Sequence, residues 1–171
     1  MKNQIEKALG VLLDLPLWNA GRSADVVWFD FGWQRHIQLS RTDGRKVMVG
    51  EYVIDTECAW HIAGPTGIVV ASRDRLYPAG DPYQDLLNFE WDNQGMNRCD
   101  ERLSGFMVEH ESFPLIVQSV TSNNWGGVNL SLTDGFFLEI FPDDSLDREY
   151  WRLYKPHTRG KHFVVTAHGI E

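Results

Sequence analysis

The sequence predicts an α+β fold, mostly antiparallel β, in which a bent sheet or incomplete barrel carries an N-terminal helix packed on it. Aromatic residues make up 12% of the 171 residues, and broad rings pack well across a pleated sheet. Apolar and polar residues alternate along several segments, as expected for strands with one buried face. Helical periodicity is clear only near the N-terminus, so we expect one helix there.

Residues 3–14 are predicted to form this amphipathic helix. Its apolar residues recur every three or four positions and share one face, and they are Ile5, Ala8, Leu9, Leu12 and Leu13. Pro16 cannot continue the helix because it lacks an amide hydrogen and clashes with the preceding turn. Residues 15–22 are then expected to be a loop.

The first strand is predicted at residues 25–31, where Val, Trp and Phe dominate. A second strand at residues 37–40 is followed by Asp43-Gly44, a pair that suits a tight hairpin turn, and the returning strand begins near Lys46. Beyond Gly50 the apolar residues move from odd to even positions as far as residue 62. A one-residue slip exchanges the two faces of a strand, so we predict a bulge at or near Gly50.

Residues 64–67 form a predicted turn into a short buried strand at residues 68–71. The segment 73–100 lacks any sustained period, apart from a helical turn proposed at residues 83–87. An irregular connection of this length inside a compact domain is usually functional or mobile. It is therefore the first place where we expect a site.

Three strands are predicted as a meander at residues 115–120, 128–132 and 136–141, and two more at residues 150–154 and 161–167. We find no internal repeat, low-complexity tract or linker. The chain is therefore predicted to be a single domain over residues 1–171, a length that suits one hydrophobic core.

The charge balance argues against several classes of partner. Sixteen basic and twenty-four acidic residues give a net charge of −8, which repels nucleic acid phosphates and anionic lipids. The N-terminal apolar run is interrupted by Asp14 and Pro16, so it suits neither a signal peptide nor a membrane span. We expect a cytoplasmic protein that binds neither nucleic acid nor membranes.

The two cysteines, Cys58 and Cys99, are expected to be free thiols in a reducing compartment, because a secreted disulfide scaffold has denser cysteine. Cys58 shares a strand face with Trp60 and Ile62, so it is predicted to be a core residue. Cys99 lies among polar residues and is predicted to be a surface thiol.

No motif points to catalysis, a metal or a cofactor. The six histidines lack paired spacing for zinc, and no phosphate-binding glycine loop or G-x-S-x-G motif is present. Asp55, Glu57 and His61 share one strand face and could serve as metal ligands or as an acid–base pair. A solvated strand face explains them better than a metal site, so we predict no metal, no cofactor and no catalytic residue.

Two groups of charged residues are candidates for a binding site. The first group lies beside strand ends and could form a polar pocket for a small ligand or, as we favour, ordinary ion pairs and turn caps; it comprises Arg22, Asp25, Arg73, Asp74, Arg75 and Asp81. The second group would form a patch for a basic protein if its members converge in space; it comprises Asp92, Asp100, Glu101, Asp143, Asp144 and Asp147.

Three stretches of the chain resemble an uncharacterised bacterial protein family: LPLWNAGRSAD at residues 15–25, CAWHI with GPTGIVV at residues 58–70, and DERL at residues 100–103. The resemblance runs from about residue 10 to the C-terminus. Members of that family often carry Pro and Arg where this chain has Ala59 and His61. The resemblance implies a bacterial cytosolic protein, and no activity, ligand or catalytic residue.

These observations favour a non-enzymatic binding protein, specifically an immunity-type protein that neutralises a basic toxin by covering it. Small size, acidic charge and the absence of a catalytic motif motivate this hypothesis. The alternative is a small-molecule-binding domain or enzyme with its site between the sheet and the segment 73–100, using Arg22, Asp25, Arg73 and Asp74. A third hypothesis is a structural subunit with an apolar patch at Trp33 or Trp125.

Overall fold

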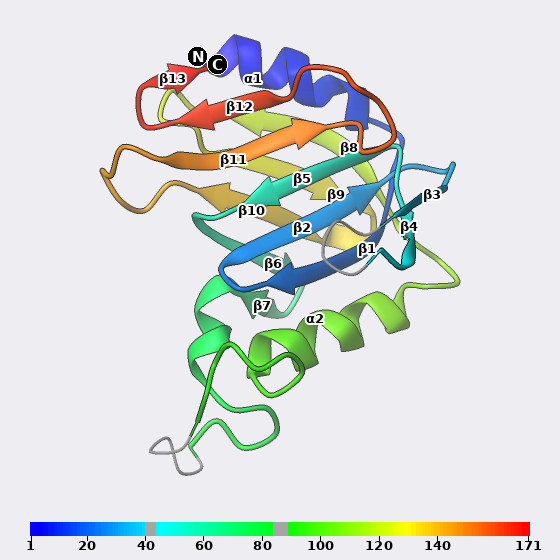
Figure 1. Ribbon diagram of the computed structural model, residues 1–171, viewed down its shortest axis with the longest axis vertical. Coiled ribbons are helices and arrows are strands. Elements are labelled where there is room, and N and C mark those ends of the chain that lie inside the picture. The colour runs from blue at the N-terminus through cyan, green and yellow to red at the C-terminus, as the bar shows by residue number, and fades with distance from the viewer. Residues whose placement is uncertain (40–43, 84–88) are drawn as a thin grey trace.

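The structure is a computed structural model, and it describes residues 1–39, 44–83 and 89–171 (Figure 1). The predicted N-terminal helix is confirmed as α1 (Lys2–Leu9), which is followed by a 3-10 turn, η1 (Gly10–Leu12). Ile5, Leu9 and Leu12 are fully buried on its apolar face. The carboxylate of Glu6 accepts a hydrogen bond from the backbone N–H of Ser122, which fixes the helix to the sheet.

Eleven strands of the described chain form one open sheet in which all neighbours run antiparallel, in the order β13-β12-β11-β5-β2-β1-β8-β9-β10-β6-β7. The strands are β1 (Pro16–Ser23), β2 (Val26–Phe31), β5 (Tyr52–Thr56), β6 (Ala59–Gly64), β7 (Gly67–Ala71), β8 (Leu115–Ser122), β9 (Val128–Leu132), β10 (Phe137–Phe141), β11 (Glu149–Tyr154), β12 (Phe163–Thr166) and β13 (Gly169–Ile170). The predicted fold class, α+β with a large sheet that does not close, is confirmed.

The sheet bends so that its two halves face each other across the core. Figure 1 shows β12, β11, β5, β2 and β1 in the front layer, β9, β10 and β6 behind them, α1 at the top and a second helix, α2 (Arg98–Glu109), at the bottom. Buried apolar residues from Ile5 to Val165 form one cluster between the layers. No helix among the described residues has the length and apolar character that crossing a bilayer requires.

Several elements were absent from the sequence prediction, and β1 and α2 are the most important of them. Residues 15–22, predicted to be a loop, are mostly strand β1, which occupies a central place in the sheet. Helix α2 lies at the end of the segment predicted to be irregular, and a 3-10 turn, η2 (Ser72–Leu76), lies at its start. The helical turn predicted at residues 83–87 falls largely on 84–88, outside the described residues.

The predicted hairpin after residue 36 is confirmed as β3 (His36–Leu39) and β4 (Lys46–Val49), although most of its turn lies outside the described residues. These strands form a separate two-stranded sheet. Because β2 and β5 are hydrogen-bonded neighbours, the hairpin is an insertion between two adjacent strands. It therefore projects beside the outer surface of the front layer (Figure 1).

The prediction of a bulge near Gly50 is wrong, because the chain passes there from one sheet to the other. The change from odd to even apolar positions marks this transfer between β4 and β5. A side chain at Gly50 would place its Cβ 2.5 Å from the carbonyl oxygen of Phe31. Glycine therefore permits the close approach of the two backbones at this corner.

Candidate functional site

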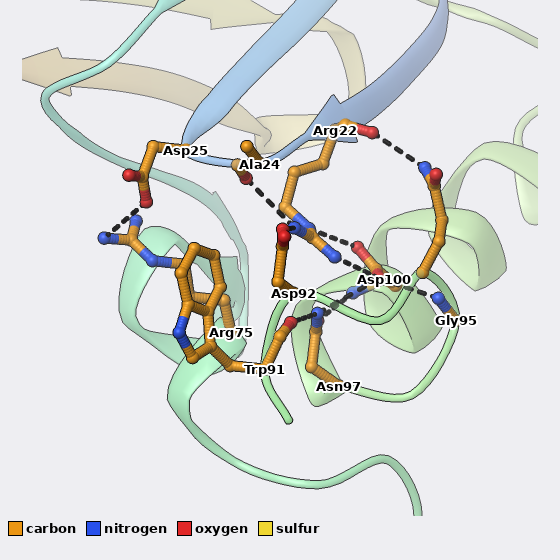
Figure 2. A network of polar contacts seen from close by, with 10 residues as sticks. Arg22, Ala24, Asp25, Arg75, Trp91, Asp92, Gly95, Asn97 and Asp100 are labelled. Carbon is orange, nitrogen blue, oxygen red and sulfur yellow. Dashed lines mark hydrogen bonds and ion pairs between the residues drawn. The ribbon is translucent and has the colours of Figure 1, made fainter. Parts of the chain in front are cut away.

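Arg22, from the first predicted group, is buried in the structure, and Figure 2 shows the contacts of its guanidinium group. Its Nε and Nη2 donate to the two carboxylate oxygens of Asp100 at 2.8 Å each, and its Nη1 donates to the carbonyl oxygen of Ala24. Asp92 lies 3.5 Å from the same Nη1. We call Arg22, Asp92, Asn97 and Asp100 the arginine cluster.

Asp100 receives further donors because of its position in the first turn of α2. Asn97 caps the helix by accepting from the Asp100 N–H, and its own amide donates to the Asp100 carboxylate at 3.0 Å. The N–H of Gly95 donates to the same carboxylate. Burial alone would raise the pKa of Asp100, but the bonds from Arg22, Gly95 and Asn97 outweigh burial and hold that pKa below its ordinary value.

The rest of the first group is only partly drawn together. Asp25 pairs with Arg75 at 3.3 Å, and the guanidinium groups of Arg22 and Arg75 both lie within about 6 Å of the Trp91 ring centroid (Figure 2). Asp74 pairs with Arg98 and accepts from the Ala71 N–H. The side chain of Arg73 is exposed, and Asp81 accepts from the N–H of Tyr83.

The second predicted group makes separate local contacts. Asp143 accepts from the Ala59 N–H, Asp144 pairs with Arg148, and Asp147 lies 3.1 Å from His168. Glu101 accepts from the N–H of Gly80, while Asp92 and Asp100 belong to the arginine cluster. Each of these carboxylates therefore has a local partner, and they do not form one shared patch.

A hollow of about 410 Å³ lies beside the arginine cluster, between β1 and α2. Arg22 and Asp100 both line it, but the guanidinium group already donates to two carboxylates and a carbonyl. The cluster ties α2 to the sheet with its hydrogen bonds already satisfied. This geometry suits a structural contact better than a ligand site.

A larger hollow of about 680 Å³ lies on the outer surface of the front layer, and we call it the outer cleft. The hairpin β3–β4, the strands β1, β2, β5 and β11, and the loop after β11 all contribute residues to it. Its principal lining residues are Asn19, Trp28, Asp30, Gln38, Val49, Val53, Asp55, Arg152, Tyr154, Lys155 and His162.

Strand register places the polar residues of the outer cleft in two rows across the sheet. One row runs Gly21, Trp28, Asp55, Arg152, and the next runs Asn19, Asp30, Val53, Tyr154. Side chains directly opposite on neighbouring strands are close enough to interact, and so are diagonal neighbours. The two carboxylates are diagonal neighbours, one on β2 and one on β5.

Asp30 is almost completely buried, and its carboxylate joins the hairpin corner to the sheet. It accepts from the backbone N–H of Gly50 and from the side-chain amide of Asn19, each at 2.9 Å. Burial raises its pKa even though both hydrogen bonds lower it. Asp30 therefore holds the β4–β5 corner in place without a basic partner.

Asp55 is the most chemically distinctive group in the outer cleft. Burial raises its pKa to about 6, and Tyr154, which donates from its hydroxyl at 3.2 Å, lowers this only in part. No ion pair in the described residues includes Asp55 or Asp30, although Arg152 lies opposite Asp55. A half-buried carboxylate that titrates near neutral pH is typical of functional sites.

Trp28 provides a flat aromatic surface beside these carboxylates. Its indole lies over Gly21, where a Cβ would come within 2.4 Å of the ring. Glycine at this place on β1 leaves room for the ring against the sheet. An indole face supplies both apolar contact and an attraction for cations.

The basic side chains of the outer cleft already have contacts elsewhere. Arg152 donates to Glu149 on its own strand, and the Lys155 ammonium lies over the ring of Tyr52 at 4.7 Å. His162 stacks on Tyr154. Burial, with Asp55 as the next cause, raises the pKa of the Tyr154 phenol, so it stays a hydrogen-bond donor.

Asp55, Glu57 and His61 do not converge, because β5 and β6 belong to opposite layers of the bent sheet. His61 instead contacts Glu139, at 2.6 Å, on the neighbouring strand β10. The described residues contain no group of three or more side chains that could hold a metal ion. Asp55 lines a cleft, so the prediction of a solvated strand face does not describe its surroundings.

Both thiols are free and buried. Cys58 is a core residue as predicted, and burial raises its pKa to about 11. The prediction of a surface thiol at Cys99 is wrong: it lies on the inner face of α2, and burial raises its pKa to about 12. Neither thiol has the lowered pKa that a nucleophile needs.

No family model, curated protein or solved structure matches this chain. The resemblance to a bacterial family therefore stays a prediction.

Proposed function

We propose that this protein binds a small molecule in the outer cleft. The single observation that supports the proposal is the Asp55 carboxylate, which is held largely out of water in a hollow of about 680 Å³ with no ion-pair partner in the described residues. A hollow of this size suits a metabolite-sized ligand. The alternative ligand site considered from the sequence was near Arg22, and the proposed site lies on the other surface of β1.

Cleft geometry supports binding more than catalysis. Among the described residues that line the cleft there is no thiol, and the Tyr154 hydroxyl that donates to Asp55 has a raised pKa, which does not suit a nucleophile. Its polar groups project from adjacent strands of a sheet, where the neighbours fix their directions. We therefore propose recognition as the function of this site.

The proposal is tested by a thermal-shift screen of the purified chain with primary metabolites grouped as amines, sugars, carboxylates and phosphates. We expect at least one compound to raise the unfolding temperature, because a ligand that binds only the folded state stabilises it. Asp55→Asn and Trp28→Leu should each reduce that shift. The control is Glu139→Gln, which changes a carboxylate on the other layer and should leave the shift intact.

A screen with no stabilising compound, or hits that survive both cleft substitutions, would overturn the proposal. Confirming that each variant unfolds cooperatively separates loss of binding from loss of folding. Neither outcome depends on the identity of the ligand.

Binding of a basic protein remains a second proposal. One observation favours it: the outer surface of the hairpin exposes Ile37, Leu39 and Met48, with Trp33 exposed just before it. Exposed apolar side chains that lie together are typical of interaction sites. If a tagged chain captured one basic protein that salt released, and Ile37→Ser with Met48→Ser abolished capture, this function would be supported over the first.

A further inference from the structure

We infer that the ligand of the outer cleft is a small organic cation with N–H donors, an ammonium or guanidinium compound, whose charged group binds between Asp55 and the indole face of Trp28. This inference rests on the proposed ligand-binding function and adds the chemical class of the ligand. It follows from the charges, the hydrogen-bond acceptors and the aromatic surface of the cleft.

The inner charges of the cleft that lack an ion pair in the described residues are carboxylates, whereas the Lys155 ammonium at its edge is exposed. Asp30 and Asp55 have no ion-pair partner in the described residues, whereas Arg152 is paired with Glu149. The other basic side chains of the cleft also have contacts, since the Lys155 ammonium lies over the ring of Tyr52 and His162 stacks on Tyr154. Since the whole chain also carries a net charge of −8, both the local and the overall field favour a cation over an anion.

The cleft offers acceptors that lack donors. The side-chain carbonyl oxygen of Gln38 is shielded from solvent and has no hydrogen-bond partner in the described structure. Among the described residues, the Tyr154 hydroxyl donates to one of the two oxygens of Asp55. A buried acceptor without a donor is costly, so a ligand that carries N–H groups matches these acceptors best.

The aromatic surface lies where it can contact the same charged group. Trp28 and Asp55 are directly paired on β2 and β5, and both line the cleft. Indole is the aromatic side chain that attracts cations most strongly, and the attraction increases when water is excluded. An adjacent carboxylate and indole face are therefore complementary to an ammonium group.

Arg152 limits the size and placement of this cation. It lies opposite Asp55 on the side away from Trp28, so a ligand charge is favoured on the Trp28 side of the carboxylate and disfavoured on the Arg152 side. The same cation near Asp30 would gain a second favourable interaction, because Asp30 is the diagonal neighbour of Asp55 on β2.

The test uses three aromatic probes of similar size and different charge: benzylammonium, benzyl alcohol and benzoate. A fourth probe, benzyltrimethylammonium, keeps the charge but has no N–H donor. Binding to the intact chain at pH 7.5 is followed by two-dimensional NMR titration, which locates the site from the amides that shift.

We expect benzylammonium to bind at least tenfold more tightly than benzyl alcohol and to perturb the amides of β2 and β5. Benzoate should be the weakest probe, and benzyltrimethylammonium should lie between the cation and the alcohol. Asp55→Asn should remove the preference for the cation, because its amide has almost the same shape without the charge. Glu139→Gln on the other layer should keep it.

Equal or tighter binding of benzyl alcohol or benzoate at the same amides would overturn the cation inference while leaving a ligand-binding cleft. Perturbation by benzylammonium confined to amides outside β2 and β5 would overturn it as well. Absence of binding by all four probes would also reject the cation inference, and the metabolite screen decides separately whether the binding proposal itself fails.

Discussion

Two charged regions lie on opposite surfaces of β1, and they differ in how their charges are compensated. In the arginine cluster, a buried guanidinium donates to two oxygens of Asp100, and that carboxylate also receives bonds from Asn97 and Gly95. In the outer cleft, Asp55 receives a hydroxyl bond and has no ion-pair partner in the described residues. Compensated charge holds a fold together, whereas uncompensated charge is available to a ligand.

The pKa values show the same contrast. Both carboxylates are partly removed from water, which raises the pKa of each. In Asp100 the bonded guanidinium and amides reverse that effect, and in Asp55 the effect of burial prevails. Substitutions that break the first region should therefore destabilise the chain, and those that neutralise the second should not.

The largest expected effect comes from Arg22→Met. Its removal leaves Asp100 enclosed without its bidentate partner, so the free energy of unfolding should fall by about 3–5 kcal/mol. Urea unfolding at pH 7 measures this change. The matched control is Arg75→Met, which breaks a more exposed ion pair with Asp25 and should cost less than about 1 kcal/mol.

Equal losses in the two arginine variants would show that the arginine cluster contributes no more than a surface ion pair. The structural interpretation of Arg22 would then be wrong. The hollow beside it would again compete with the outer cleft as a ligand site.

The next effect in size concerns the aromatic surface of the cleft. Gly21→Ala puts a methyl group within 2.4 Å of the Trp28 ring, so the indole must move, and overpacking of this kind costs about 1–3 kcal/mol. Thermal unfolding and tryptophan fluorescence report the change. As a control, Gly105→Ala in α2 meets no atom within 4 Å and should stabilise the helix by about 0.5–1 kcal/mol.

Opposite signs for the two alanine substitutions are the essential result. If Gly21→Ala were neutral, the indole would move freely and would not form a fixed surface for a ligand. In that case the carboxylates, and not the indole ring, would be the ordered groups that a ligand could recognise in the cleft.

The sequence predicted the architecture well where periodicity was strong. Alternation at residues 128–132 and the helical spacing of Ile5 and Leu9 located real elements. Strand β1 was missed because Asn19, Gly21 and Arg22 interrupt the alternation of apolar and polar residues. Glycine at position 21 leaves room for the Trp28 ring of the neighbouring strand β2. The pattern of residues within β1 could not predict this role of Gly21, because it depends on the pairing of β1 with β2.

Helix α2 did leave a signal that the periodicity analysis overlooked. Cys99, Leu103 and Phe106 are spaced by four and three residues and are all buried, and Asn97 is a suitable N-cap with acidic residues in the first turn. Recognising this pattern would also have predicted a buried Cys99. The polar composition of the preceding segment obscured it.

The outer cleft was harder to predict, because it depends on which strands become neighbours. Asp30 stands between two Phe residues in β2, which is an unusual place for a carboxylate and a usable signal. Its relation to Asp55 follows only from the β2–β5 register. The position of the inserted hairpin beside these residues cannot be predicted from sequence alone. Alternation with a period of two shows which residues share a face of a strand, but it does not show which strands are neighbours.

A smaller effect is expected from Asp55→Asn, with a sign opposite to that of Arg22→Met. The folded-state pKa of about 6 lies above the ordinary 3.8, so folding favours the protonated form. Stability therefore falls as pH rises from about 4 to 6, and it stays lower above pH 6. The titratable and charged groups around Asp55 are Asp30 on β2 and Arg152, Tyr154 and Glu149 on β11.

Asparagine removes this cost while it can still accept from Tyr154. At pH 8 the variant should be more stable than the native chain by about 1 kcal/mol, a value that is reduced because Asp55 is partly exposed. At pH 4 the two chains should have the same stability. Urea unfolding at both pH values measures the difference. The control Asp147→Asn alters a side chain that is 83% exposed and should show little change; a loss of stability for Asp55→Asn at pH 8 would contradict the proposed role.

The smallest effect concerns the attachment of the hairpin beside the cleft. His36 on β3 stacks on His157 in the loop after β11, with ring centroids 3.7 Å apart. Partial burial first, and then His36 and Lys155, lower the pKa of His157, while Glu51 raises it. Protonation is therefore less favourable in the folded chain, so this contact contributes fully above about pH 6.5 and weakens as pH falls below it.

A two-stranded hairpin is marginally stable alone, so its amides should exchange with solvent faster when this contact weakens. Hydrogen exchange of β3 and β4, corrected for the intrinsic pH dependence, should show less protection at pH 5.5 than at pH 7.5, corresponding to a few tenths of a kcal/mol. His36→Phe keeps an aromatic ring but does not titrate, so it should reduce the difference. If protection were the same at both pH values, the histidine contact would not hold the hairpin, and Asp30 with its bond to Gly50 would be the main attachment of this side of the cleft.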